Sequence, residues 1–156
     1  MTSCTQHYKV DSTPETIWAA LEDAHGYLTT VMGAAPVRLS GGWPRPGSVA
    51  RHEVCAGSLR QAALTIVRTA VAPDVLHLEV RAGLLGTLGV DLELEPWGGG
   101  TLVTVREYPL SPTGPLSFAR SLPLMTLLKR RHPELLLRVE GAQPAVSLTG
   151  TGRATS

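Results

Sequence analysis

The sequence contains few aromatic residues and few cysteines. Its 156 residues include three Trp, three Tyr and one Phe, so a buried core has to be built from Leu, Val, Ile and Ala. The two cysteines, Cys4 and Cys55, form neither a metal-binding motif nor a disulfide framework. Gly98–Gly100 is not followed by a helix that could receive a phosphate, so it is no nucleotide-binding loop. We therefore expect no metal and no cofactor.

An excess of charge and long hydrophobic runs are also missing. The formal net charge is +1, which excludes the basic footprint of a nucleic-acid-binding protein. The longest uncharged stretches, about a dozen residues, are shorter than the roughly 18 that a membrane span needs. A signal peptide has a basic patch followed by an apolar run, and residues 1–7 show neither. We expect a cytoplasmic domain over residues 1–140 and a flexible tail over 141–156. The oligomeric state stays open.

Alternating and apolar runs bounded by Gly, Pro and Asp predict seven β-strands. They are Thr5–Val10, Val37–Leu39, Val49–Cys55, Leu59–Ala70, Val75–Ala82, Leu88–Glu95 and Leu102–Tyr108. In the sixth run Val90, Leu92 and Leu94 share one face, and Asp91 and Glu93 lie on the other. Such alternation is typical of an antiparallel sheet with one wet face. Residues 97–100 predict a hairpin turn between the last two strands.

The remaining chain has helical signals at two places. After the first strand, Ser12 or Thr13 can cap a helix with Pro14 at its first position, and Gly26 is expected to end it. Its buried stripe is Ile17, Trp18 and Leu21. Residues 27–32 follow as a short second helix or a loop.

A long closing helix is predicted from about Leu116 to Val139. Pro123 and Pro133 each remove a backbone donor, so we expect breaks or kinks there. One long helix is the only large element available to cover the apolar face of the sheet. Either the sheet collapses onto this helix or a ligand cavity lies between them, and the scarcity of bulky aromatics favours the cavity.

Four segments resemble the START-like superfamily, also called SRPBCC. Val10–Trp18 is similar to its opening strand and Pro-Glu helix start, and Glu95–Val105 to its Gly-Gly-Thr hairpin. Trp43–Ser48 and Arg106–Ser111 are similar to a bacterial branch described as polyketide cyclase/dehydrase-like. The resemblance covers about residues 5–140.

The resemblance implies an α+β helix-grip fold, in which a curved antiparallel β-sheet is wrapped around a long C-terminal helix, with two short helices after the first strand. It also implies an apolar cavity, but not one reaction, because the superfamily includes lipid carriers, metabolite binders and aromatase/cyclases. We expect the protein to bind a small hydrophobic molecule, lipid-like or polyketide-like, between sheet and helix. One alternative is a polyketide cyclase/dehydratase-type enzyme; another is a partner-binding module without a ligand.

Glu107 and His52 are the candidate catalytic residues. Glu107 follows Val103 and Val105 onto the face expected to point inward, where a buried carboxyl could act as a general acid or base. His52 is in phase with Val54 and could polarise a ligand carbonyl or move a proton. The alternatives are a strand that frays before Pro109, which would leave Glu107 in solvent, and a His52 bonded to a neighbouring backbone group.

The candidate ligand-binding residues fall into two groups. The first comprises Tyr27, Met32 and Trp43, expected in loops at the cavity mouth, where polarizable or amphipathic side chains suit an adaptable apolar opening. The second comprises residues expected to line the cavity: Val54, Leu92, Val105, Leu124 and Leu128. By contrast, His77, Glu79 and Arg81 alternate with apolar residues and are expected on the wet face.

Overall fold

The computed structural model describes residues 3–110, 115–139 and 146–148. The strands are β1 (Cys4–Val10), β2 (Arg38–Ser40), β3 (Val49–Ala56), β4 (Leu59–Val71), β5 (Val75–Arg81), β6 (Thr87–Trp97), β7 (Gly100–Pro109) and β8 (Val146–Leu148). The helices are α1 (Pro14–Glu22), α2 (Ala24–Val31) and α3 (Pro115–Val139), with a 3-10 turn, η1 (Gly83–Leu85). Each of the seven expected strands is present with its ends within two residues of the prediction.

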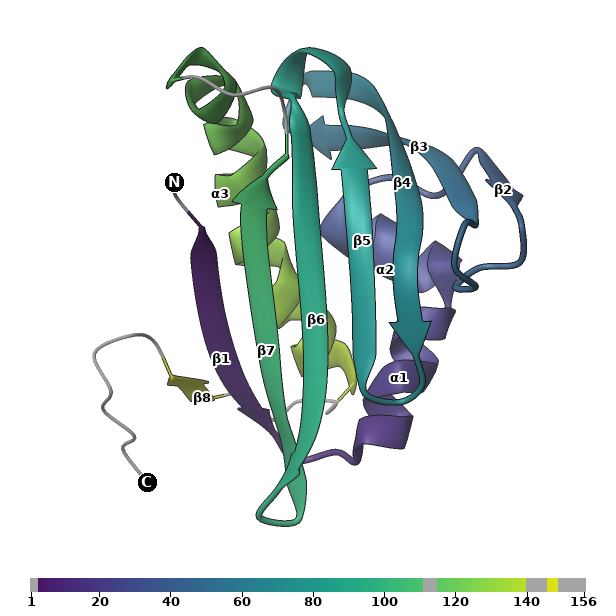
Figure 1. Ribbon diagram of the computed structural model, residues 1–156, viewed down its shortest axis with the longest axis vertical. Helices are drawn as coiled ribbons and strands as arrows, with labels where there is room; N and C mark the ends of the chain where they lie inside the picture. Colours follow the sequence, from purple (N-terminus) through teal and green to yellow (C-terminus); the bar gives the residue numbers. More distant parts are fainter. Residues whose placement is uncertain (1–2, 111–114, 140–145, 149–156) are drawn as a thin grey trace.

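The strands form one antiparallel sheet in the order β2-β3-β4-β5-β6-β7-β1-β8. The sheet curves, and the three helices lie on one side of it, with α3 behind β6 and β7 in the view of Figure 1. This is the expected α+β helix-grip architecture: a curved sheet around a long C-terminal helix, preceded by two short helices.

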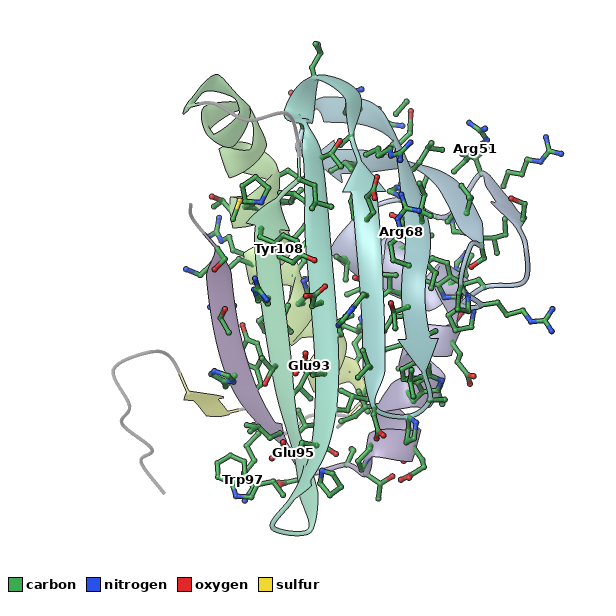
Figure 2. All side chains as sticks on the ribbon, in the orientation of Figure 1. Arg51, Arg68, Glu93, Glu95, Trp97 and Tyr108 are labelled. Atoms are coloured by element: carbon green, nitrogen blue, oxygen red, sulfur yellow. The ribbon has the colours of Figure 1, made fainter. Side chains whose placement is uncertain are left out.

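The two faces of the sheet differ in polarity as the alternation predicts. Leu92 on β6 pairs with Val105 on β7 and Leu76 on β5, and all three are buried beneath the helices. The other face carries ion pairs, including those from Glu79 to Arg68 and Arg81, at 2.6 and 2.5 Å. Figure 2 shows this face, with Arg68, Glu93 and Tyr108 labelled on the side of the sheet away from α3.

The junction between the first two helices differs from the prediction. The Thr13 side chain caps α1 by accepting from the Thr16 backbone N–H, as expected. However, α1 ends at Glu22, and Gly26 lies inside α2 rather than ending α1. The reason is Asp23, which is the C-cap of α1 and also the N-cap of α2, where its carboxylate accepts from the Gly26 N–H at 3.1 Å.

α3 is one continuous helix of 25 residues, so the expected breaks at Pro123 and Pro133 do not occur. Pro133 removes the hydrogen bond that the Lys129 carbonyl would have accepted, but Lys129 lies on an exposed side of the helix, where water can replace it. On the opposite side Leu124, Leu128 and Leu135 are buried against the rest of the core. Their packing continues the helix through both prolines.

The sheet has one more strand, β8 next to β1, than the sequence predicts. Strand β8 pairs antiparallel with β1, which lies between β7 and β8. The expected flexible tail over 141–156 lies outside the described residues except for these three. Because a short strand can add to a sheet edge through backbone hydrogen bonds alone, it needs no hydrophobic pattern of its own.

Candidate functional site

Glu107 is buried on the inner face of the sheet. β7 continues to Pro109 without fraying, and Glu107 pairs in register with Val90 on β6 and Cys4 on β1. Its side chain is only 2% exposed, so the alternative of a solvated carboxyl at the rim does not hold. Glu107 therefore faces the helices, as the parity of Val103 and Val105 predicts.

Among the described residues, the basic side chain within ion-pair distance of this carboxyl is His132 of α3. Its Nδ1 lies 3.3 Å from Oε2 of Glu107, and it is itself 1% exposed. Nδ1 also lies 3.0 Å from the Leu128 carbonyl oxygen, and Nε2 lies 2.8 Å from the Tyr27 hydroxyl. Because a carbonyl can only accept, the Nδ1–H donates to Leu128, and in a neutral ring Nε2 accepts from Tyr27.

The hydrogen bonds of His132 leave Glu107 without one. Among the described residues, neither carboxyl oxygen of Glu107 has a hydrogen-bond partner, although both are shielded from solvent. Buried polar atoms in native proteins nearly always have a partner, and burying an unpaired charge is costly. This orphaned carboxyl is one of three described side chains, with Trp18 and His77, that bury polar atoms without a hydrogen-bond partner, and it is the acidic one.

Two tyrosines near the carboxyl have raised pKa values, chiefly because they are buried and to a smaller extent because of Glu107. Burial, with the negative charge of Glu107 and a smaller contribution from Cys4, raises the pKa of Tyr8 to about 12. Burial and Glu107 also raise the pKa of Tyr27 far above its ordinary value. Both hydroxyls are thus held as donors: Tyr8 donates to the Gln6 side chain and Tyr27 to His132. Neither donates to Glu107.

His52 is at a different place on the sheet from Glu107. It lies on β3, and β4, β5 and β6 separate that strand from β7. Its Nε2 is 2.7 Å from the Thr65 hydroxyl, and its Nδ1 is 3.1 Å from the Glu53 carbonyl oxygen. Burial lowers the pKa of His52, opposed by the Glu53 bond. Both ring nitrogens have partners, which matches the alternative of a histidine bonded to a neighbouring backbone group.

Of the three residues expected in loops at the cavity mouth, Tyr27 and Met32 lie deeper than predicted. Tyr27 belongs to α2 and Met32 is its C-cap, and both are fully buried rather than placed in loops. Trp43 does lie in a loop, where its indole N–H donates to the Leu21 carbonyl at 2.9 Å. Its ring centroid is 6.2 Å from that of Tyr27. Of the two possibilities for residues 27–32, a short helix or a loop, the helix is the one formed: α2 packs against α3, so Tyr27 and Met32 do not lie in a loop.

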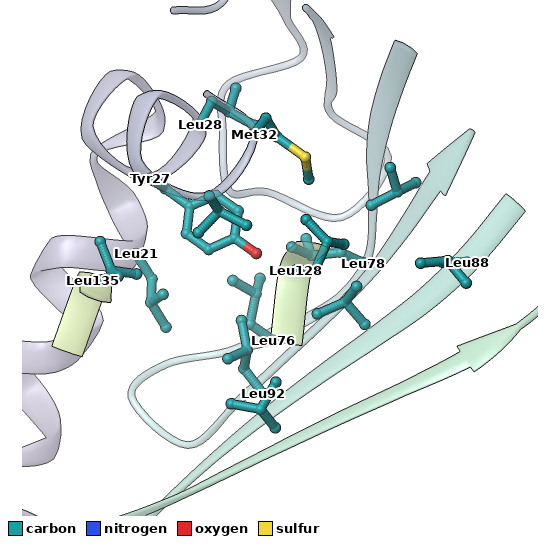
Figure 3. Packing of buried hydrophobic residues seen from close by; sticks show 14 of the residues in the cluster. Leu21, Tyr27, Leu28, Met32, Leu76, Leu78, Leu88, Leu92, Leu128 and Leu135 are labelled. Carbon is teal, nitrogen blue, oxygen red and sulfur yellow. The ribbon is translucent and has the colours of Figure 1, made fainter. Parts of the chain in front are cut away.

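The expected lining residues all belong to the closed core. Val54, Leu92, Val105, Leu124 and Leu128 are each 3% exposed or less. Figure 3 shows Leu128 of α3 facing Leu76 and Leu92 of the sheet, with Tyr27 and Met32 beside them. Leu92 and Val105 also line a cavity of about 10 Å³ between α1, α3 and the sheet, which His132 borders. That volume holds about one water molecule, so this cavity is smaller than the ligand space expected from the sequence.

A second, more open groove of about 230 Å³ lies outside the space between α3 and the sheet. It is lined by residues of α1 and α2, with Asp23 between them, and by the C-terminal end of α3. There Arg138 donates to the Thr30 hydroxyl at 2.8 Å and joins the two helices.

His132 was not among the candidate residues expected from the sequence. A signal was present: Leu124, Leu128 and His132 follow one another at intervals of four, which places the histidine on the buried side of the closing helix. The expected break at Pro133 obscured it, because a helix ending there would leave His132 at a frayed terminus. Its pairing with Glu107 and Tyr27 follows only from the tertiary structure.

No helix in the described part of the chain is long and apolar enough to cross a membrane. Within the same residues, no three His, Cys, Asp or Glu side chains are grouped as a metal ion would require.

The fold resembles that of many solved structures, although no protein-family model and no curated protein matches the sequence. The di-domain ARO/CYC BexL from the BE-7585A biosynthetic pathway matches with a TM-score of 0.69 at 13% identity, over 92% of this chain and 51% of that one. Ara h 8.0201 matches with a TM-score of 0.65 at 12% identity, over 90% and 95%. A protein from Rhodobacter sphaeroides matches with a TM-score of 0.65 at 20% identity, over 88% and 89%.

These likenesses define the class of the protein as a helix-grip domain. They confirm the helix-grip fold that the resemblance of the sequence implies. At 20% identity or less they show the fold alone.

Proposed function

We propose that the protein binds a small, largely apolar molecule between α3 and the inner face of the sheet. The observation that carries this proposal is the orphaned carboxyl of Glu107, a buried acceptor in apolar surroundings with no hydrogen-bond partner among the described residues. A bound molecule would supply the missing donor and bury its own apolar surface against the neighbouring aliphatic side chains.

Binding at this place requires movement. The cavity of about 10 Å³ next to His132 cannot hold a molecule of drug or lipid size, so side chains or α3 itself must shift away from the sheet. Pro133 favours such a shift, because it removes one hydrogen bond from the helix one residue after His132. The bound state would then be a minor conformation that the ligand stabilises.

The test is a substitution that fills the space between helix and sheet. An environment-sensitive apolar dye or a fatty acid is expected to bind the native protein, and Leu128→Trp is expected to weaken that binding. Leu84→Trp is the matched control, because Leu84 is 78% exposed in η1 and lies outside this space. Native mass spectrometry of the purified protein provides a second readout through a co-purifying molecule. Absence of binding to every apolar probe would contradict the proposal and favour a partner-binding module.

A second candidate function is general acid/base catalysis of the polyketide cyclase/dehydratase type. It is favoured by the 3.3 Å separation of Glu107 from His132 in a closed, water-poor interior. The fold shared with the ARO/CYC BexL agrees with this candidate. His52 would contribute only if a substrate reached across the sheet to β3. General acid/base groups contribute about 10²–10⁴-fold to rate, so Glu107→Gln should lower turnover by about that factor while the protein stays folded.

A further inference from the structure

Three strong hydrogen-bond donors of Tyr8, Tyr27 and His132, whose side chains lie near Glu107 in the described part of the chain, are used by other acceptors. The Tyr8 hydroxyl donates to Gln6, the Tyr27 hydroxyl to His132, and the His132 Nδ1–H to the Leu128 carbonyl. Of the described side chains near Glu107, only the thiol of Cys4, its register partner on β1, is uncommitted, and a thiol is a weak donor. A ligand that satisfies it must bring its own donors.

The described surroundings of Glu107 also lack a permanently charged basic side chain. Among the described residues, no Arg or Lys side chain lies within ion-pair distance of its carboxyl, and His132 is the single basic group that does. A neutral imidazole can make both hydrogen bonds of His132, one as donor and one as acceptor. Beside a neutral His132, a Glu107 carboxylate has no cation to balance it among the described residues, so a cationic ligand would gain more here than a neutral one.

The aromatic side chains near the carboxyl also suit a cation. The ring of Tyr27 lies 5.8 Å from that of His132 and 6.2 Å from that of Trp43. The electron-rich faces of Tyr and Trp attract ammonium groups, most strongly where water is excluded. A carboxyl beside such rings, above an aliphatic core, combines the elements of a site for an apolar amine.

Building on the proposed function, we infer that the ligand is an apolar molecule bearing a protonated amine, whose N–H groups donate to Glu107 while its apolar part packs between α3 and the sheet. Glu107 and the ammonium then form a buried, hydrogen-bonded ion pair. The amine takes the place of the missing donors without breaking the Tyr27–His132–Leu128 chain of hydrogen bonds.

Two probes that differ in one functional group test this inference. Naphthylmethylamine and naphthylmethanol have the same apolar part, but only the amine carries a positive charge. Calorimetric titration of the native protein is expected to show at least about tenfold tighter binding of the amine, as a charge-assisted hydrogen bond implies. Glu107→Gln, which keeps the size of the side chain, is expected to remove this preference and leave the affinity for the alcohol within about threefold.

Glu93→Gln is the matched control, because Glu93 is exposed on the opposite face of the neighbouring strand and should leave the amine preference intact. Circular dichroism verifies that both variants are folded, and if Glu107→Gln does not fold, the preference of the native protein decides alone. Equal affinities for amine and alcohol would overturn the inference and leave the proposed function standing. Failure of both probes and of the apolar dye would overturn the two together.

Discussion

The Tyr27 hydroxyl lies 2.8 Å from Nε2 of His132, so a residue of α2 is hydrogen-bonded to a residue 105 positions later, in α3. Both side chains are at most 1% exposed. This bond joins the short helices to the closing helix inside the core, and it fixes the ring of His132 next to Glu107. The polar site therefore depends on contact between α2 and α3, which are far apart in the sequence.

Tyr27→Phe is expected to destabilise the fold by about 1–3 kcal/mol, because it leaves Nε2 of His132 buried without a partner. Urea unfolding monitored by circular dichroism measures the change. Tyr108→Phe is the control: its hydroxyl donates to Asp91 at 3.1 Å on the outer face of the sheet, and because Tyr108 is only half-buried, water can reach Asp91 once the hydroxyl is gone, so the loss should cost about 1 kcal/mol or less. Equal losses for the two variants would contradict the buried bond.

The tyrosines of the folded protein are expected to resist ionisation at pH 10. The chain has three, Tyr8, Tyr27 and Tyr108, and burial raises the pKa of each, to about 12 for Tyr8. In the unfolded chain they ionise near pH 10. Stability from these groups is therefore complete below pH 10 and is lost as the pH rises above it. Ultraviolet absorbance titration with and without denaturant measures this, and a native curve identical to the denatured one would refute it.

Acid is expected to destabilise the protein through His52. Burial lowers its pKa in the folded state, so the unfolded chain binds a proton first as the pH falls below about 6.5. The stability that His52 contributes is present above that pH and declines below it, by at most about 1.4 kcal/mol per pH unit. His52→Gln should flatten the decline between pH 7 and 5, as measured by urea unfolding. His25→Gln, at an exposed position, should leave the slope as it is in the native protein.

Two glycines of the central strands are expected to differ in their tolerance of a side chain. A Cβ at Gly100 would lie 2.2 Å from the Val10 backbone oxygen, which the β1–β7 pairing holds in place. A Cβ at Gly89 would meet the Tyr108 ring at 2.3 Å, and that side chain can rotate away. Gly100→Ala should therefore cost more than about 2 kcal/mol and Gly89→Ala about 1 kcal/mol in thermal unfolding. The reverse order would show that the backbone near Val10 can move.

Much of the fold could be predicted from local patterns. The alternation of Val90, Leu92 and Leu94 with acidic residues placed the correct face of β6 inward, because side chains on a strand alternate strictly between two faces. The same parity placed Glu107 inside. The helical spacing of Leu124 and Leu128 predicted their burial in α3. Each of these expectations depends only on neighbours in the sequence.

Other features could not be predicted because they depend on partners distant in the chain. Pro133 has a local tendency to interrupt a helix, but the packing of the leucines in α3 against the sheet outweighs it. Gly26 is a different case, because its tendency to end a helix is outweighed by capping from Asp23, a local partner only three residues away. β8 has no local signal, since an edge strand needs only backbone pairing.

For the site itself, the sequence alone determined that a carboxyl at position 107 points inward, because strand parity is a local property. Only the tertiary structure decided what meets it there. His132 lies on α3 and Tyr27 on α2. The periodicity within each helix does not predict how the two helices pack against each other. The hydrogen bonds of His132 and Tyr27 to each other and to Leu128 use the donors of both side chains, and Glu107 is left without a hydrogen bond among the described residues. Which buried acceptor remains unsatisfied depends on side-chain packing in three dimensions, because donors are shared among whichever groups the fold brings together.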